Sequence, residues 1–189
     1  QHCSNLKEIP AKLFEPIPDL TSMHYYYYCG MFYECTSLKE IPAGLFDKLV
    51  KVIFDTDQQS HGLFCGCEKL EEFPYNLFDK NVKTYSFDSV FRNDTALKVG
   101  FLPLCKESNA RHEETYHNCD NMQKLIARTA TPCTIDSETI PDGIQLKIYV
   151  PDSAIETYKT ATNWSAHKDK IVGWSELTDE ERQKYGLTT

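Results

Sequence analysis

The sequence lacks any long apolar stretch, and basic residues are fewer than acidic ones. No run approaches the roughly 20 consecutive apolar residues that a membrane-spanning helix needs, so no transmembrane segment is predicted. Lysine and arginine number 20 against 28 acidic residues, which gives a formal net charge of −8. This acidic balance argues against nucleic acid or an anionic membrane surface as the main partner. The 189 residues, 41% of them hydrophobic, are enough for one well-buried domain.

Motifs of catalysis and metal binding are also missing. The sequence has no G-x-S-x-G motif, no P-loop and no pair of carboxylates placed for acid–base chemistry. Cys65 and Cys67 are separated by one residue, whereas zinc sites commonly use two to four. The weak remaining candidates are a metal site of His112, His117 and Cys119 and a nucleophile pair of His61 and Cys65. We therefore predict no enzymatic activity, no metal and no cofactor.

The beginning of the sequence carries no initiator methionine and no signal peptide. Gln1 stands two residues before the first copy of a repeated motif. We expect the sequence to be a trimmed piece of a longer chain, with an export signal and further repeats upstream.

A thirteen-residue motif occurs three times. It reads CSNLKEIPAKLFE at 3–15, CTSLKEIPAGLFD at 35–47 and CEKLEEFPYNLFD at 67–79, and the opening cysteines recur every 32 residues. A unit of this length is too small to bury its own apolar face, so it must stack on copies of itself. The sequence therefore predicts a repeat solenoid.

Each unit is marked by three spaced positions. An aromatic residue precedes the register position by three residues, and an aliphatic residue follows it by three. Five units can be counted, the last two shorter, with register residues Cys3, Cys35, Cys67, Asp94 and Cys119. A cysteine that recurs at one register is usually a small buried side chain in a stacked ladder. For the cysteines outside that register, a bridge between Cys29 and Cys65 of adjacent coils is an alternative.

The L-K-E-I-P segment of each unit predicts a short strand. Its Leu and Ile should point inward and its Lys and Glu outward, and its Pro should end the strand because it lacks an N–H donor. A second apolar run follows at 50–54 and 82–87. We expect each coil to contribute two short strands, one to each of two parallel sheets, linked by turns and short helical plugs.

The pattern changes after about residue 130. Residues 131–176 are predicted to be a capping segment, with a β-rich run at 147–150 and a helix over 154–160 begun by a capping box of Ser153 and Glu156. Trp164, Ile171, Val172 and Trp174 should cover the open end of a solenoid over 1–130. Residues 177–189 are expected to be a polar tail, with a short helix over 179–185 and a frayed end.

These motifs resemble a known family. The phased F-x-x-C-x-x-L-x-x-I-P pattern resembles the BspA-like (treponemal-type) leucine-rich repeats of bacterial surface proteins. The ending, K-I-Y-V-P-D-S-A-I-E-T-Y-K-T-A-T-N-W-S, is similar to the C-terminal segment of such proteins in gut Bacteroidetes. The resemblance covers about residues 3–174, although the first units are longer than usual, with extra residues between Asp47 and Leu63.

The resemblance implies an α/β repeat solenoid: a leucine-rich-repeat-like right-handed coil with short parallel strands, short helical plugs and a C-terminal cap. It also implies a secreted or outer-membrane-attached module, often a lipoprotein, that binds an extracellular protein or glycan in adhesion. A structural spacer that presents another domain is the alternative, and an enzyme is a weaker one. Fold alone does not decide between them.

Two groups of residues are candidates for partner binding. The outward strand positions should stack into a charged ladder, and four consecutive tyrosines should place rings on an exposed face. The ladder comprises Lys7, Glu8, Lys39, Glu40, Glu71 and Glu72, and the tyrosines are Tyr25, Tyr26, Tyr27 and Tyr28. The alternative for the ladder is a solvated, salt-bridged sheet, and for the tyrosines an aromatic ladder packed on neighbouring coils.

Overall fold

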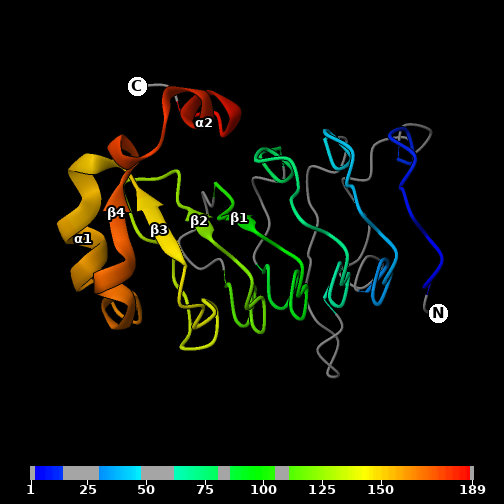
Figure 1. Ribbon diagram of the computed structural model, residues 1–189, viewed down its shortest axis with the longest axis horizontal. Helices are drawn as coiled ribbons and strands as arrows, with labels where there is room; N and C mark the ends of the chain where they lie inside the picture. Colours follow the sequence, from blue (N-terminus) through cyan, green and yellow to red (C-terminus); the bar gives the residue numbers. More distant parts are fainter. Residues whose placement is uncertain (1–2, 15–29, 48–61, 81–85, 105–110, 188–189) are drawn as a thin grey trace.

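The structure is a computed structural model of the chain, and it describes residues 3–14, 30–47, 62–80, 86–104 and 111–187. Successive segments of the chain lie side by side along the long axis of the molecule, with the N-terminus at one end (Figure 1). Helix α1 (Ile155–Thr160) lies at the opposite end, beyond the last strand.

Four short strands form one parallel sheet in the order β1-β2-β3-β4. They are β1 (Val99–Phe101), β2 (Lys124–Ile126), β3 (Lys147–Val150) and β4 (Ile171–Gly173). Each strand pairs with the next along the chain, so the rest of each unit forms the crossover that parallel pairing requires. The chain thus has α/β character, with a small parallel sheet and few helices.

The strands do not lie where the sequence motif is most regular, which corrects our expectation. In the three L-x-x-[IF]-P copies, the described residues contain only an isolated parallel bridge between Glu8 and Glu40. The amide N–H of Lys39 donates to the carbonyl of Lys7 over 3.2 Å, but the proline three residues on has no N–H to continue the ladder. Strand β1 has Phe101 at the position of that proline, and there the ladder extends.

The expected second sheet is represented among the described residues by one parallel bridge, between Ser86 and Arg111. The predicted runs at 50–54 and 82–85 lie outside the described residues. The N–H groups of Phe87, Ser89, Phe91 and Asn93 instead donate to carbonyls of the following unit, over 2.8 to 3.1 Å. Alternate amides therefore join neighbouring units without regular strands.

A column of aromatic rings runs through the core at the position three residues before each register residue. Phe32 stacks on Phe64 with ring centroids 5.2 Å apart, Phe64 on Phe91 at 5.6 Å, and Phe91 on Tyr116 at 5.7 Å. Each contact adds about 0.5–1.5 kcal/mol beyond the burial of apolar area. The Tyr116 hydroxyl donates to the carbonyl of Phe101 over 2.6 Å, so the polar end of the column is also satisfied.

The register cysteines form the predicted buried ladder. Cys35, Cys67 and Cys119 are at most 1% exposed, whereas Cys3 in the first unit is exposed. The thiol of Cys67 donates to the carbonyl of Phe32 over 3.3 Å, and that of Cys119 to the carbonyl of Phe91 over 3.0 Å. Cys65 is a buried free thiol, and Cys29, the partner in the alternative bridge, lies outside the described residues.

The segment after β3 packs against the edge strand β4. It contains the 3-10 turn η1 (Asp152–Ala154), helix α1, η2 (Trp164–Lys170) and η3 (Trp174–Glu176). Trp164 is 1% exposed and meets Tyr158 edge to face at 4.8 Å, while its indole N–H donates to the carbonyl of Cys133 over 2.9 Å.

The predicted capping box at Ser153 is wrong. The chain enters α1 through η1, so Ser153 lies inside a helical turn, and no side chain caps either element. The capping box of this chain stands instead at Thr178 and Glu181, where helix α2 (Asp179–Lys184) begins.

The C-terminal arm, residues 177–187, contains the predicted short helix, but up to residue 187 it is packed against the rest of the chain rather than frayed. Leu177, Tyr185 and Leu187 are each 3–4% exposed, and the Tyr185 ring meets that of Phe101 at 5.4 Å. Helix α2 is thereby held over the sheet rather than projecting from it (Figure 1). None of the helices in the described ranges is long and apolar enough to cross a membrane.

Candidate binding groove

The outward positions of the repeat are exposed as the alternation predicted. Leu38 and Leu70 are fully buried and Ile41 is 5% exposed. The six charged candidates between these apolar positions are all exposed: Lys7, Glu8, Lys39, Glu40, Glu71 and Glu72. The motif therefore builds the core with one set of side chains and a polar face with the other.

Part of this polar face is a groove. The groove has a volume of about 860 Å³, and Lys39, Glu40, Glu71 and Glu72 are among its lining residues. Lys7 and Glu8 do not line it. Side chains that the sequence did not single out complete it: Glu68, Lys69, Lys98, and Lys184 and Tyr185 of the arm. Glu68, Lys69 and Lys98 belong to the repeat units, whereas no local pattern could indicate Lys184 and Tyr185, because the arm folds back over units far away in sequence.

Ion pairs fix the arm along the groove. Lys184 of α2 contacts Glu72 at 2.8 Å, and immediately before the arm Glu176 of η3 contacts Lys147 of β3 at 2.8 Å. The Lys124 ammonium contacts the Glu181 carboxylate, and this hydrogen bond lowers the pKa of Glu181. Partly exposed pairs contribute about 0.2–1 kcal/mol each, so together they orient the arm more than they stabilise it.

The C-terminal end of the arm rests on Tyr75. A Cβ on Gly186, where φ is +66°, would lie 2.4 Å from the Tyr75 ring, so only glycine fits between the backbone and the ring. Arg128 lies over the same ring, 5.3 Å from its centroid, and pairs with Asp79. The half-buried ring of Tyr75 therefore belongs to the packing of the arm.

A second hollow continues the groove toward the C-terminal units. Its volume is about 610 Å³, and it shares Glu71, Ala96, Lys98 and Gln123 with the first. Its far wall is the turn before β3, which carries Asp142 and Ile144, and Asp120 stands beside it. Ile144 is fully exposed, which is unusual for a large apolar side chain next to a concave surface. We call the two hollows together the trough.

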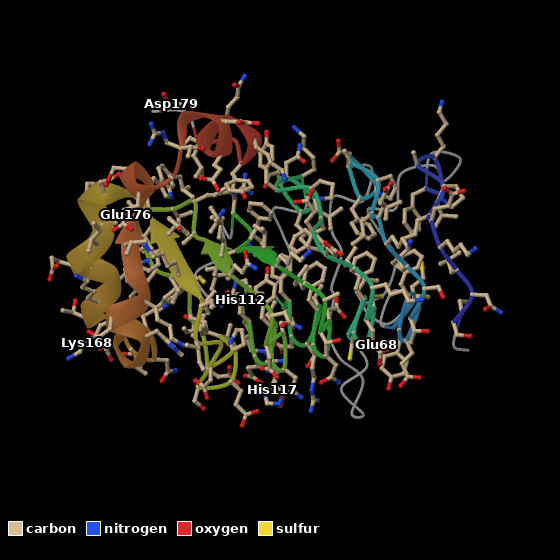
Figure 2. All side chains as sticks on the ribbon, in the orientation of Figure 1. Glu68, His112, His117, Lys168, Glu176 and Asp179 are labelled. Carbon is tan, nitrogen blue, oxygen red and sulfur yellow. The ribbon has the colours of Figure 1, made fainter. Side chains whose placement is uncertain are left out.

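The remaining sequence candidates do not join this site. Tyr25 to Tyr28 and His61 lie outside the described residues. His112 stacks on Phe87 at 5.2 Å inside the protein, while His117 lies 3.4 Å from Glu138 at the lower edge of the view (Figure 2). In the described part of the chain no three His, Cys, Asp or Glu side chains are grouped so that they could hold a metal ion. Burial raises the pKa of Cys65 to about 11, which keeps this thiol protonated.

Comparison with protein-family models and with curated proteins gave no match for this chain.

Proposed function

We propose that the chain is a leucine-rich-repeat-like solenoid of the BspA type, and that it acts as a non-catalytic module binding an extracellular protein or glycan in adhesion. Its place would be the cell surface or the extracellular medium. The stacked aromatic column, the cysteine ladder and the unit-to-unit hydrogen bonds support the solenoid, since each recurs with the period of the repeat.

The proposed binding function rests on the groove. It lies along the outward positions of successive units, and a separate element of the chain forms its wall. Its lining contains four lysines and four glutamates, of which only Lys98–Glu71 and Lys184–Glu72 pair within the described residues. Lys39, Glu40, Glu68 and Lys69 remain available to a partner. This arrangement suits recognition along a surface better than chemistry on one small substrate.

The test is a screen of the chain on arrays of extracellular proteins and glycans, followed by charge reversal in the groove. The double variant Lys39→Glu, Glu40→Lys should weaken binding of the strongest array ligand at least about fivefold and leave the far-UV circular dichroism unchanged. The matched control is Lys7→Glu, Glu8→Lys, which makes the same change one unit earlier, outside the groove.

Three outcomes separate the alternatives. Equal weakening by both variants, or by neither, would show that this groove is not the binding face. A chain without any selective array ligand would be a spacer. Binding lost only in the groove variant supports the proposal.

A further inference from the structure

Near the arm, the charged side chains of the trough form ion pairs. At the far end of the trough, two carboxylates do not pair within the described ranges. Near the arm, Lys98 pairs with Glu71, and Lys184 pairs with Glu72. The two lysines on the neighbouring strands, Lys124 and Lys147, form ion pairs with Glu181 and Glu176, respectively. Both lysines that the structure describes on β2 and β3 therefore have a carboxylate partner.

The far end of the trough holds two acids that form no ion pair within the described part of the chain, although Asp142 interacts electrostatically with His167. Asp120 and Asp142 both line the second hollow and are exposed. Their only lysine neighbour in that lining is Lys98, which is already paired with Glu71. Ile144 stands in the same wall with its whole side chain in water. Negative charge and exposed apolar surface thus coincide at this end.

The trough is long, and it exposes little aromatic surface. It crosses the segments of Lys39, Glu71, Lys98, Gln123 and Gln145, four spacings of about 4.8 Å or roughly 20 Å, which is about six residues of extended chain. The rings in its lining offer little open face for a sugar: Phe73, Phe101 and Tyr185 are buried, and Tyr75 is half-buried against Arg128 and Gly186.

We propose that the partner of this trough is an extended polypeptide segment carrying a cationic side chain close to an apolar one. This inference rests on the proposed function and narrows it from protein or glycan to polypeptide. The cation binds between Asp120 and Asp142, the apolar side chain covers Ile144, and the mixed charges of Lys39, Glu40, Glu68 and Lys69 meet the other end of the segment. Charge complementarity fixes the direction in which the segment lies.

Labelled peptides of about twelve residues are the probes. The first repeats Lys-Ser-Val-Ser, so that in an extended chain Lys and Val share one face. The second has Glu in place of Lys, the third has Ser in place of Val, and an uncharged glucose hexasaccharide represents glycans. Fluorescence anisotropy at about 20 mM salt keeps surface charges only partly screened. The Lys/Val peptide should bind best and the Glu/Val peptide least.

Variants of the full chain locate the site. Asp120→Asn with Asp142→Asn should weaken binding of the Lys/Val peptide by about tenfold, and Ile144→Ser by about fivefold. The control pair Glu156→Gln with Asp169→Asn removes the same charge from exposed positions outside the trough and should leave the affinity unchanged.

Failure of this inference is distinguishable from failure of the proposed function. Absent binding of the Lys/Val peptide, equal binding of the Glu/Val peptide, or an affinity that Asp120→Asn with Asp142→Asn does not change each overturns the polypeptide assignment. Preferred binding of the hexasaccharide overturns it too, but leaves the adhesion module intact. An array ligand that the groove variant still binds normally would overturn the proposed function instead.

Discussion

Replacing Asp94 with cysteine should stabilise this protein, because Asp94 is an acid at a register position where the other units have a cysteine. Its side chain is fully buried, and one of its oxygens, Oδ2, has no hydrogen-bond partner. The other oxygen, Oδ1, accepts from the amide of Cys67 over 2.7 Å. That amide also donates to the carbonyl of Phe64 over 3.1 Å, so it keeps a partner when the carboxyl group is removed.

The magnitude follows from these contacts. An unsatisfied buried acceptor costs about 1–3 kcal/mol, and a net hydrogen bond contributes about 0.5–1.5 kcal/mol. By analogy with Cys67 and Cys119, which donate to the carbonyl of the aromatic residue one unit earlier, a thiol at position 94 should donate to Phe64. We therefore expect the variant to gain about 1–3 kcal/mol in free energy of unfolding at neutral pH.

The pH dependence gives the sign of a second effect. Burial raises the pKa of Asp94 well above its ordinary value of about 3.9 in an unfolded chain. At pH values between the unfolded and the folded pKa of Asp94, the native protein binds a proton that the unfolded chain has released. The contribution of Asp94 to the free energy of unfolding is therefore fully present below about pH 4 and is lost as pH rises toward the folded pKa. The cysteine variant should lose this fall, and its advantage should grow from acidic to neutral pH.

Urea unfolding under reducing conditions, followed by circular dichroism between pH 4 and pH 8, measures both effects. Asp94→Asn is the control, because it removes the charge while keeping the shape of the side chain. It should flatten the pH dependence without restoring the thiol contact. A cysteine variant less stable than the parent chain, or one with the parent's pH slope, would refute the reasoning.

Four further results are expected. Burial lowers the pKa of His112 to about 4, so the free energy of unfolding should fall by about 3 kcal/mol between pH 7 and pH 4. In urea titrations His112→Phe should remove that part of the acid sensitivity, and an unchanged dependence of stability on pH would contradict this prediction. Gly62→Ala should cost about 1–3 kcal/mol or more in urea unfolding, because a Cβ there would lie 1.8 Å from the carbonyl oxygen of Ser89; a neutral effect would mean that the two units do not touch there. Iodoacetamide at pH 8 should leave Cys67 unmodified in the native protein by peptide mapping, since burial raises the pKa of its thiol, and rapid labelling would place it at the surface. A chain truncated before Lys147 loses β3 and β4 and should aggregate, whereas soluble, cooperative unfolding by light scattering and calorimetry would show that the remaining units are self-sufficient.

The repeat motif predicted the core well because its information is local and repeated. The L-x-x-[IF] copies direct the same two side chains inward, and the register residues are buried from Cys35 onward, whereas Cys3 in the first unit is exposed. The motif could not predict where the ladder lengthens into strands, because that depends on what replaces the proline, as Phe101 does. Regularity of sequence and regularity of hydrogen bonding therefore run in opposite directions along this chain.

The groove was only half predictable for a different reason. Its floor comes from the repeat, but its wall comes from an arm whose apolar anchors, Leu177, Tyr185 and Leu187, are spread over a segment rich in charge. Such a segment appears polar by composition. Only its contacts, such as Tyr185 on Phe101 in a distant unit, reveal that it is part of the packed structure.

The arm also sets the order in which the protein can become complete. Contacts between neighbouring units join residues about 22 to 35 positions apart, whereas Lys184 and Glu72 are separated by 112. Closing so long a loop is entropically unfavourable until the intervening units have already brought its ends together. The arm should therefore dock last during folding and detach first during unfolding. A partly folded chain would then have the packed repeat core but lack the wall of the groove. The binding proposed for the groove would then be restricted to molecules that have finished folding.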